Sequence, residues 1–187
     1  MRLLFVLVAV LGLTSCGWNA NSRLIPMAER AVPDVTGEFQ FEGRTISFER
    51  RLPGNLVEVV AMLEDGSTER TTVAFDLLRI VRDDNGTRSF YLIEMDHTTE
   101  DGASFGYELF AIDQGVDAEG APLPDPTIAW YSLNCADASD RFDSDPEQRC
   151  QFSRYADLML AADDLLTWML DPRIPLLVDD GRRLSED

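Results

Sequence analysis

Tight-turn dipeptides divide residues 35–133 into short β-forming segments, and this division constrains the fold more than any other feature. Asp65-Gly66, Asn85-Gly86 and Asp101-Gly102 each allow the positive φ angles that a tight reversal requires. Glu42-Gly43 is a further candidate hairpin tip. Strands joined by such short connections must run antiparallel. The pattern therefore predicts an antiparallel meander.

The segments between these turns have the alternation of half-buried strands. Phe39 and Phe41 alternate with polar neighbours, and Ile46 and Phe48 do the same. The expected strands, all rich in β-branched or aromatic residues, are 38–42, 44–50, 56–63, 71–81, 89–97, 105–112 and 127–133. Residues 114–126 are rich in glycine and proline and predict a longer surface loop. The fold class is mainly β (α+β), a barrel or strongly curved antiparallel sheet of about 7–8 strands.

The hydrophobic period changes from two residues to that of a helix after residue 150. The apolar residues at helical spacing are Tyr155, Leu158, Met159, Ala162, Leu165, Leu166 and Met169. Ser153 can cap the start of this helix, and Asp171-Pro172 ends it. We expect one helix near 154–170, packed on the sheet, and a short final strand at 174–178.

The N-terminus has the features of an export signal. Met1 and Arg2 precede an apolar run over residues 3–13, which is too short for a spanning helix of about 20 residues. The sequence Leu13-Thr14-Ser15-Cys16 resembles the lipobox of bacterial lipoproteins, in which a branched apolar residue and two small residues precede a cysteine. An ordinary signal peptide with a nearby cysteine is the alternative.

The resemblance implies a lipid anchor at Cys16. The thiol would receive a diacylglycerol, the chain would be cut before Cys16, and the freed amine would be palmitoylated. In this class an aspartate after the cysteine commonly retains the protein at the inner membrane, whereas here Gly17 follows. The implied location is therefore the cell envelope, at the outer membrane facing the periplasm. The membrane is then the first partner, through the lipid.

The domain organisation follows from the same resemblance. Residues 1–15 are the signal peptide, and residues 35–187 are a single β-rich domain. Residues 16–34 are the lipidated N-terminus and a tether, because their composition is mixed and shows little periodicity. No second long apolar run follows.

The charge balance excludes several function classes. Acidic residues outnumber basic ones by 34 to 16, a net charge of -18, so the chain would repel nucleic acid. Every basic residue is arginine, which excludes catalysis by a lysine. A basic envelope protein is chemically reasonable as a second partner.

Two cysteines remain once Cys16 carries lipid. Cys135 and Cys150 form an even pair in a compartment that would be oxidising, so we expect a disulfide. Closing a loop of about 15 residues would stabilise the fold by roughly 3 kcal/mol.

The loop between these cysteines is acidic. It contains the carboxylates Asp137, Asp140, Asp143, Asp145 and Glu147. A hard cation such as Ca²⁺ takes six to eight oxygen ligands, so the loop is a candidate calcium site and calcium the only candidate cofactor. The spacing does not match an EF-hand, and a solvated acidic loop is the alternative.

A second motif points to hydrolysis. Gly102-Ala103-Ser104-Phe105-Gly106 matches the G-x-S-x-G nucleophile elbow, with His97 nearby. An elbow lies between a strand and a helix, but the residues after Gly106 alternate as a strand. We therefore expect no catalytic residue and no enzyme, and a serine hydrolase built on Ser104 and His97 only if a helix follows Gly106.

Aromatic residues suggest a third possibility, a cavity for an apolar ligand. The candidates are Phe90, Tyr91, Phe105, Tyr107, Phe110, Trp130 and Tyr131. The order of elements resembles that of lipocalins, but Gly37-Glu38-Phe39 has phenylalanine where that family has tryptophan, so no binding residue is transferred. The expected function is a structural or protein-interaction role for an envelope lipoprotein. A carrier of an apolar ligand is the alternative.

Overall fold

The computed structural model describes residues 17–33, 35, 38–41, 44–63, 65–97, 102–123, 126–139, 142–143, 145, 148, 150–171 and 182–183. Within these residues the chain forms strands, a short 3₁₀ helix and one α-helix. The elements are β1 (Asn19–Ala20), β2 (Glu38–Phe41), β3 (Arg44–Leu52), β4 (Leu56–Met62), β5 (Thr68–Asp83), β6 (Gly86–Asp96), β7 (Phe105–Gly115), β8 (Thr127–Ser132), η1 (Cys135–Asp137), α1 (Tyr155–Met169) and β9 (Arg182–Arg183).

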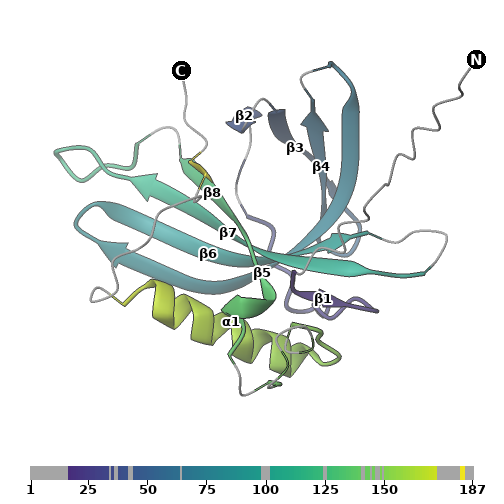
Figure 1. The fold of residues 1–187 in the computed structure, drawn as a ribbon. Coiled ribbons are helices and arrows are strands. Elements are labelled where there is room, and N and C mark those ends of the chain that lie inside the picture. Colours follow the sequence, from purple (N-terminus) through teal and green to yellow (C-terminus); the bar gives the residue numbers. More distant parts are fainter. Residues whose placement is uncertain are drawn as a thin grey trace, which may run out of the picture.

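The strands form one antiparallel meander. Strands β2 to β9 pair in sequence order, and β1 pairs with the start of β7. In Figure 1 the strands β2–β4 rise steeply from the sheet that β6, β7 and β8 continue, and α1 lies beneath. The predicted antiparallel, strongly curved sheet with one C-terminal helix is confirmed.

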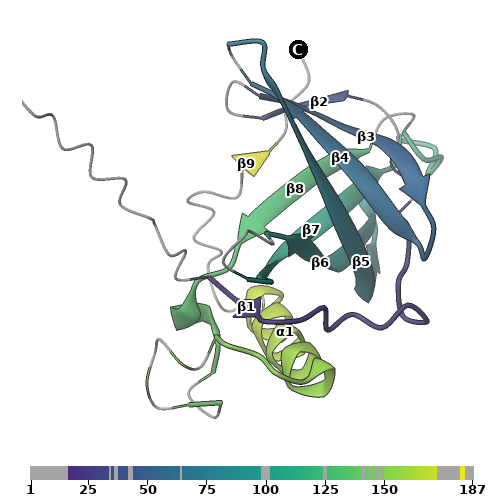
Figure 2. The ribbon, with the colours of Figure 1, turned by 90° about the vertical axis from the view of Figure 1, so that its right-hand side faces the viewer.

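The curvature has a local cause and a visible result. Register shifts interrupt β3 between Phe48 and Arg50 and β5 between Leu77 and Arg79, and such bulges bend a strand. Three strands lie between Phe48 of β3 and Phe110 of β7 in the sheet, yet their ring centroids are 5.7 Å apart. The sheet therefore curls until its two halves meet, as Figure 2 shows from the side.

Both faces of the central strands are buried. In β5, Val73 and Phe75 point into the concave side, whereas Ala74 between them belongs to the core on the opposite, convex side. The buried concave residues are Val35, Ile46, Val57, Val59, Val73, Phe75, Ile93, Phe110 and Ile128. The sheet covers its concave side by curling over it, and other segments cover the convex side.

Helix α1 covers much of the convex side. Leu158, Ala161, Ala162, Leu165 and Leu166 are buried there, which confirms the predicted helix to within a residue at each end. The predicted cap is wrong, because Arg154 occupies the N-cap position and no side chain caps the helix. In the part of the chain that the structure describes, no helix is long and apolar enough to cross a membrane.

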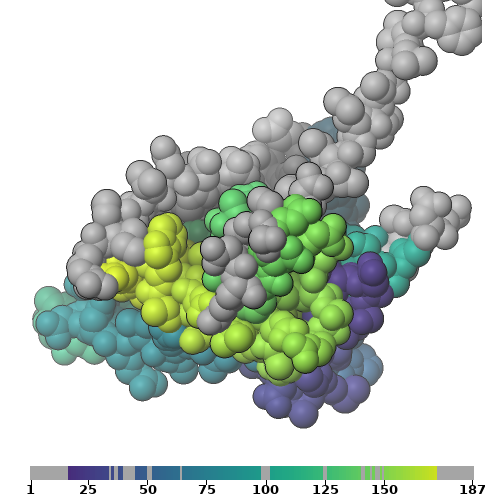
Figure 3. Space-filling view, turned by 60° about the horizontal axis from the view of Figure 1, so that its bottom comes forward, coloured from purple at the N-terminus to yellow at the C-terminus, as the bar shows by residue number. Residues whose placement is uncertain are grey.

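The N-terminal segment, residues 17–33, covers a further part of the convex side, and we call it the strap. The tether prediction is therefore wrong for these residues. Trp18 and Ile25 are each only 1% exposed and belong to the same core as α1. Figure 3 shows this segment, α1 and the residues near the disulfide gathered on one face. Aperiodicity misled the prediction because an irregular strap needs only a few buried side chains. The signal peptide, Cys16 and the expected strand at 174–178 lie outside the described residues.

Candidate functional site

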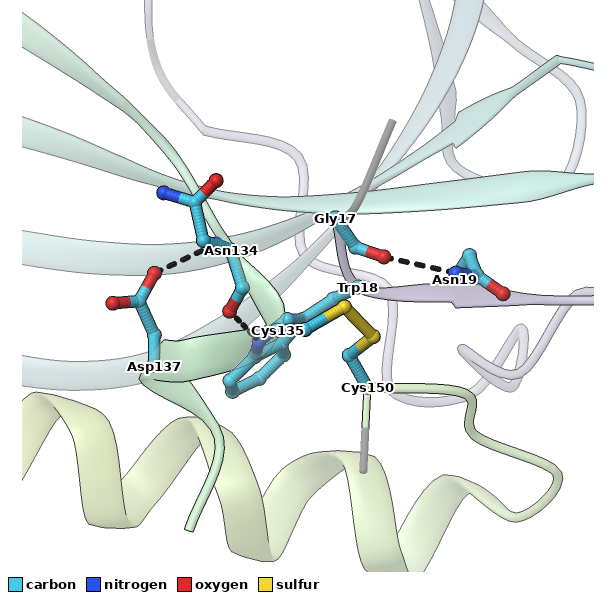
Figure 4. Close-up of a disulfide and its surroundings, with 7 residues drawn as sticks. All are labelled: Gly17, Trp18, Asn19, Asn134, Cys135, Asp137 and Cys150. Atoms are coloured by element: carbon cyan, nitrogen blue, oxygen red, sulfur yellow. Dashed lines mark hydrogen bonds between the residues drawn. A yellow bond between two sulfur atoms is a disulfide. The ribbon is translucent and has the colours of Figure 1, made fainter. Parts of the chain in front are cut away.

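The chain that follows Cys16 enters the fold at the disulfide. Cys135 and Cys150 are paired, with their Cα atoms 4.8 Å apart. On the Cys135 side, Gly17 forms a β-bridge with Asn134, and the Trp18 indole N–H donates to the Asn134 carbonyl at 3.0 Å. Figure 4 shows this arrangement around the disulfide.

The same segment is held from the Cys150 side. The Asn19 N–H donates to the Cys150 carbonyl at 2.9 Å, and the Phe152 N–H donates to the Asn19 carbonyl at 2.8 Å. The Trp18 and Phe152 rings lie 5.2 Å apart between centroids. The disulfide therefore joins the two stretches of chain that hold this segment. We call residues 17–20, with Asn134, Cys135, Cys150, Gln151 and Phe152, the anchor clamp.

A buried carboxylate holds the next part of the strap. Glu94 of β6 is fully buried, and its Oε2 accepts the N–H groups of Leu24 at 2.7 Å and Ile25 at 3.1 Å. The Tyr107 hydroxyl donates to the same oxygen at 3.1 Å, and Arg23 donates to Oε1 at 3.1 Å. Burial, and then the charge of Glu94, raise the pKa of Tyr107, so its hydroxyl remains a donor. Glu94 thus fixes an irregular segment that has no strand partner there.

A second buried carboxylate ties α1 to the sheet. Asp76 of β5 is 5% exposed and accepts a hydrogen bond of 2.6 Å from the Tyr155 hydroxyl at the start of α1. Burial raises the pKa of Asp76, the bond from Tyr155 lowers it, and the nearby charge of Glu29 raises it. The pKa of Asp76 is raised overall. This carboxyl therefore connects two elements at some electrostatic cost.

The aromatic residues proposed to line a cavity divide between the two faces of the sheet. Tyr91, Phe110 and Trp130 lie on the concave side. Phe105 and Tyr107 belong to the opposite core, and Phe90 and Tyr131 pack near α1. Phe75, Ile93 and Phe110 are fully buried among concave side chains. Protein contacts thus bury the centre of the concave side, whereas Tyr91 and Trp130 are only partly buried.

One polar group lies beside this concave core. The Glu108 carboxylate accepts hydrogen bonds from the Trp130 indole N–H and from the Ser132 hydroxyl. Burial raises its pKa above the ordinary value, and these two donors lower it by less. The hydrogen bond between Glu108 and the indole orients Trp130 at the edge of the aromatic cluster. Glu108 is therefore a half-buried carboxylate with two hydrogen-bond donors.

The candidate calcium ligands are only partly described. The Asp137 carboxylate accepts the Asn134 N–H at 2.6 Å, and the Asp143 carboxylate accepts the Asp145 N–H at 2.9 Å. Asp140 and Glu147 lie outside the described residues. Among those described, no group of three His, Cys, Asp or Glu side chains could hold a metal ion. The calcium hypothesis stays a prediction.

The G-x-S-x-G motif is not a nucleophile elbow. Strand β7 begins at Phe105 and continues to Gly115, so a strand follows Ser104 and not a helix. The backbone N–H of His97 donates to the Ser104 carbonyl at 2.8 Å, which joins the two ends of the segment that connects β6 to β7. A Cβ added to Gly106 would lie 2.9 Å from the His97 imidazole, so glycine makes room for this ring. These residues therefore serve a connection between strands.

Sequence reasoning missed Trp18, Glu94 and Asp76. Glu94 could have been noticed, because it is the one charged residue in the apolar run of residues 90–95. A continuous apolar run predicts a strand buried on both faces, so a charged residue within it is expected to be buried as well. Trp18 gave none, because the partners of its side chain, Asn134 and Phe152, are more than a hundred residues away.

Comparisons with known proteins add no relative to this site. A scan against protein-family models matches no family, and searches of the curated proteins and of the solved structures return no similar protein.

Proposed function

We propose that this protein is a bacterial envelope lipoprotein, anchored through lipid on Cys16, with a structural or protein-interaction role in the periplasm. The observation that carries the proposal is the sequence Leu13-Thr14-Ser15-Cys16 followed at once by a folded chain. Gly17 and Trp18 are already packed against the domain, so the order of signal, cysteine and domain is that of a cleaved and anchored protein.

The packing of the domain favours a role at its surface. The concave side holds a filled aromatic core, and the serine motif lies in a connection between strands. These two features support an interaction role over a buried ligand or a serine hydrolase. Contacts with another envelope protein would then use exposed side chains, and the strong negative charge favours a basic partner.

The lipid anchor is tested by mass spectrometry of the N-terminal peptide from protein made in a Gram-negative host. We expect cleavage before Cys16 and the added mass of a diacylglyceryl group and one acyl chain. Cys16→Ser should yield protein that is released from membranes, whereas Cys150→Ser should remain lipidated. A mature peptide without lipid, or one cut elsewhere, would refute the proposal.

The outer-membrane location rests on Gly17 and has its own test. After separation of the two membranes on a density gradient, we expect the parent protein with the outer membrane. Gly17→Asp should move it to the inner membrane, by analogy with the lipoprotein class. Equal distribution of the two proteins would contradict this part of the proposal.

A carrier of an apolar ligand is the second candidate. What favours it is that Tyr91 and Trp130, at the edge of the concave core, keep part of their surface exposed. Native mass spectrometry of the Cys16→Ser protein, purified from the periplasm, separates the two functions. A lipid-sized adduct would favour the carrier, and the bare oxidised chain would favour the interaction role.

A further inference from the structure

We propose that the side of the domain that carries the anchor clamp, where Asn134 and Gln151 are exposed, faces the phospholipid headgroups, so that the lipid fixes the orientation of the domain as well as its location. The inference rests on the proposed lipidation of Cys16. It goes further by naming the surface that meets the membrane and the lipid chemistry that suits it.

The distance from lipid to fold is the first argument. Cys16 and Gly17 have Cα atoms about 3.8 Å apart across a trans peptide bond. Gly17 is itself bridged to Asn134, so the fold begins one residue after the lipidated cysteine. Had residues 17–33 been a flexible tether, the domain could move on the order of 20 Å from the bilayer. The packed strap removes that freedom.

The stiffness of the attachment is the second argument. Backbone bonds tie Asn19 to both Cys150 and Phe152, and the Trp18 indole is tied to Asn134. The disulfide closes these two stretches into one covalent unit. A segment held from both sides moves with the domain, so the freedom of the domain above its anchor is limited to the bonds of Cys16 and of the lipid.

Charge is the third argument. The chain carries a net charge of -18, yet Asn134, Cys150, Gln151 and Phe152, which pair with the strap, are uncharged. Figure 4 includes one charged side chain, Asp137, whose carboxylate is bonded to the Asn134 N–H. The exposed Asp143 and Asp145 lie in the adjoining loop. The contact therefore suits zwitterionic headgroups better than anionic ones.

The absence of lysine from the sequence provides a precise test. In the lipidated protein the α-amine is acylated, so one introduced lysine is the only amine available to a dye. Ala136→Lys places it in η1 beside Cys135, and Thr68→Lys places it at the start of β5. Both positions are exposed, and the connection between β4 and β5 lies on the opposite side of the molecule from α1 (Figure 1). Gln151→Lys is a second near position should Ala136→Lys disturb the fold.

The labelled proteins are reconstituted in vesicles of phosphatidylcholine and phosphatidylethanolamine that contain a trace of lipid with an acceptor dye on its headgroup. We expect energy transfer from residue 136 to exceed that from residue 68 severalfold. Phosphatidylglycerol added to the vesicles should reduce the transfer from residue 136. Equal transfer from the near and far positions, in lipidated protein of confirmed mass, would overturn the inference and leave the proposed function intact.

A second arm separates this inference from lipidation in the cell. In a chain that begins at Cys16 with the disulfide formed, Cys16 is the free thiol and can be coupled to a maleimide phospholipid. The parent chain without lysine, labelled at its α-amine, supplies the background. A near-to-far contrast here, together with a native protein that lacks lipid, would retain the oriented surface and reject the proposed function.

Discussion

At the scale of single residues, two buried carboxylates connect parts of the chain that no strand pairing joins. Glu94 binds the irregular strap through two backbone N–H groups, and Asp76 binds the start of α1 through the Tyr155 hydroxyl. A buried charge is costly unless donors surround it. Glu94 has four donors and Asp76 has fewer, so the two should respond in opposite ways to loss of their charge.

Glu94→Gln should be strongly destabilising. The amide retains one acceptor oxygen for Leu24, Ile25 and Tyr107, but its NH₂ group then faces the Arg23 guanidinium. We expect the free energy of unfolding in urea to fall by about 2–3 kcal/mol. Glu108→Gln is the matched control on the next strand. An equal loss for the two variants would contradict the role given to Glu94.

Asp76→Asn should be stabilising at neutral pH. The amide oxygen still accepts from Tyr155, and the buried charge is gone. Because burial raises the pKa of Asp76, the folded state binds its proton more readily than the unfolded state does. The contribution of Asp76 to the free energy of unfolding of the parent should therefore become more favourable as the pH falls from neutral towards the ordinary carboxyl pKa of about 4.

The difference in free energy of unfolding between Asp76→Asn and the parent should also depend on pH. At pH 7 we expect Asp76→Asn to be more stable by on the order of 1 kcal/mol. Urea unfolding at lower pH should show this difference shrinking as Asp76 becomes protonated. A difference that does not change with pH, or a variant that is less stable at pH 7, would be evidence against a raised pKa.

At the scale of elements, each strand predicted between residues 38 and 133 is present and the errors lie at the strand ends. The expected strand 71–81 is part of β5, Thr68–Asp83, and the expected strand 89–97 overlaps β6, Gly86–Asp96. The tight turn falls on Asp84 and Asn85, so Gly86 is a strand residue and not a loop residue. The ends extend because each strand pairs with a neighbour that is itself long, and pairing does not require an apolar side chain.

Gly86→Ala tests this turn. Gly86 has φ +140°, and an added Cβ would collide with the Gln114 carbonyl of β7. Gly66 has φ +80° with open space around it, so Gly66→Ala is the matched control for backbone strain alone. We expect thermal unfolding to reveal a loss of about 1 kcal/mol for the control and about 2–4 kcal/mol for Gly86→Ala. Equal losses would contradict the close approach of β7.

At the scale of the whole molecule, the sheet needs cover on its convex side, and the N-terminal strap supplies part of it. Trp18, Leu24 and Ile25 pack in one core with Leu158 and Ala162 of α1. A sheet whose central strands are apolar on both faces cannot leave either face in water. The strap is therefore part of the domain, and the domain begins at residue 17 and not at residue 35.

Removal of the strap should abolish cooperative folding. A chain that begins at Val35 loses the large buried side chains of Trp18, Leu24 and Ile25, worth about 1.5–3 kcal/mol each. Glu94 also loses its donors from residues 23–25. We expect broad thermal unfolding and rapid proteolysis of this chain. A chain that begins at Gly17, which lacks only the lipid, is the control and should unfold cooperatively. A shortened chain that matches the control would restore the tether interpretation.

The fold was largely predictable from the sequence, and the candidate site was only partly so. Alternation, turn dipeptides and helical spacing each depend on residues close together in the chain, which is why the meander and α1 were found. The Cys135–Cys150 pair could be expected because the two cysteines are 15 residues apart and two remained after Cys16. The partners of the Trp18 side chain could not be predicted, because Asn134 and Phe152 lie far along the chain and give no local pattern.

The sequence by itself determined the order and direction of the strands and the position of α1. Those properties follow from local backbone preferences and hydrophobic period. Only the tertiary structure decided that residues 17–33 are packed and that the aromatic residues divide between two faces. The physical reason is that burial depends on which side chains meet once the sheet has curled, as Phe48 meets Phe110 across three intervening strands.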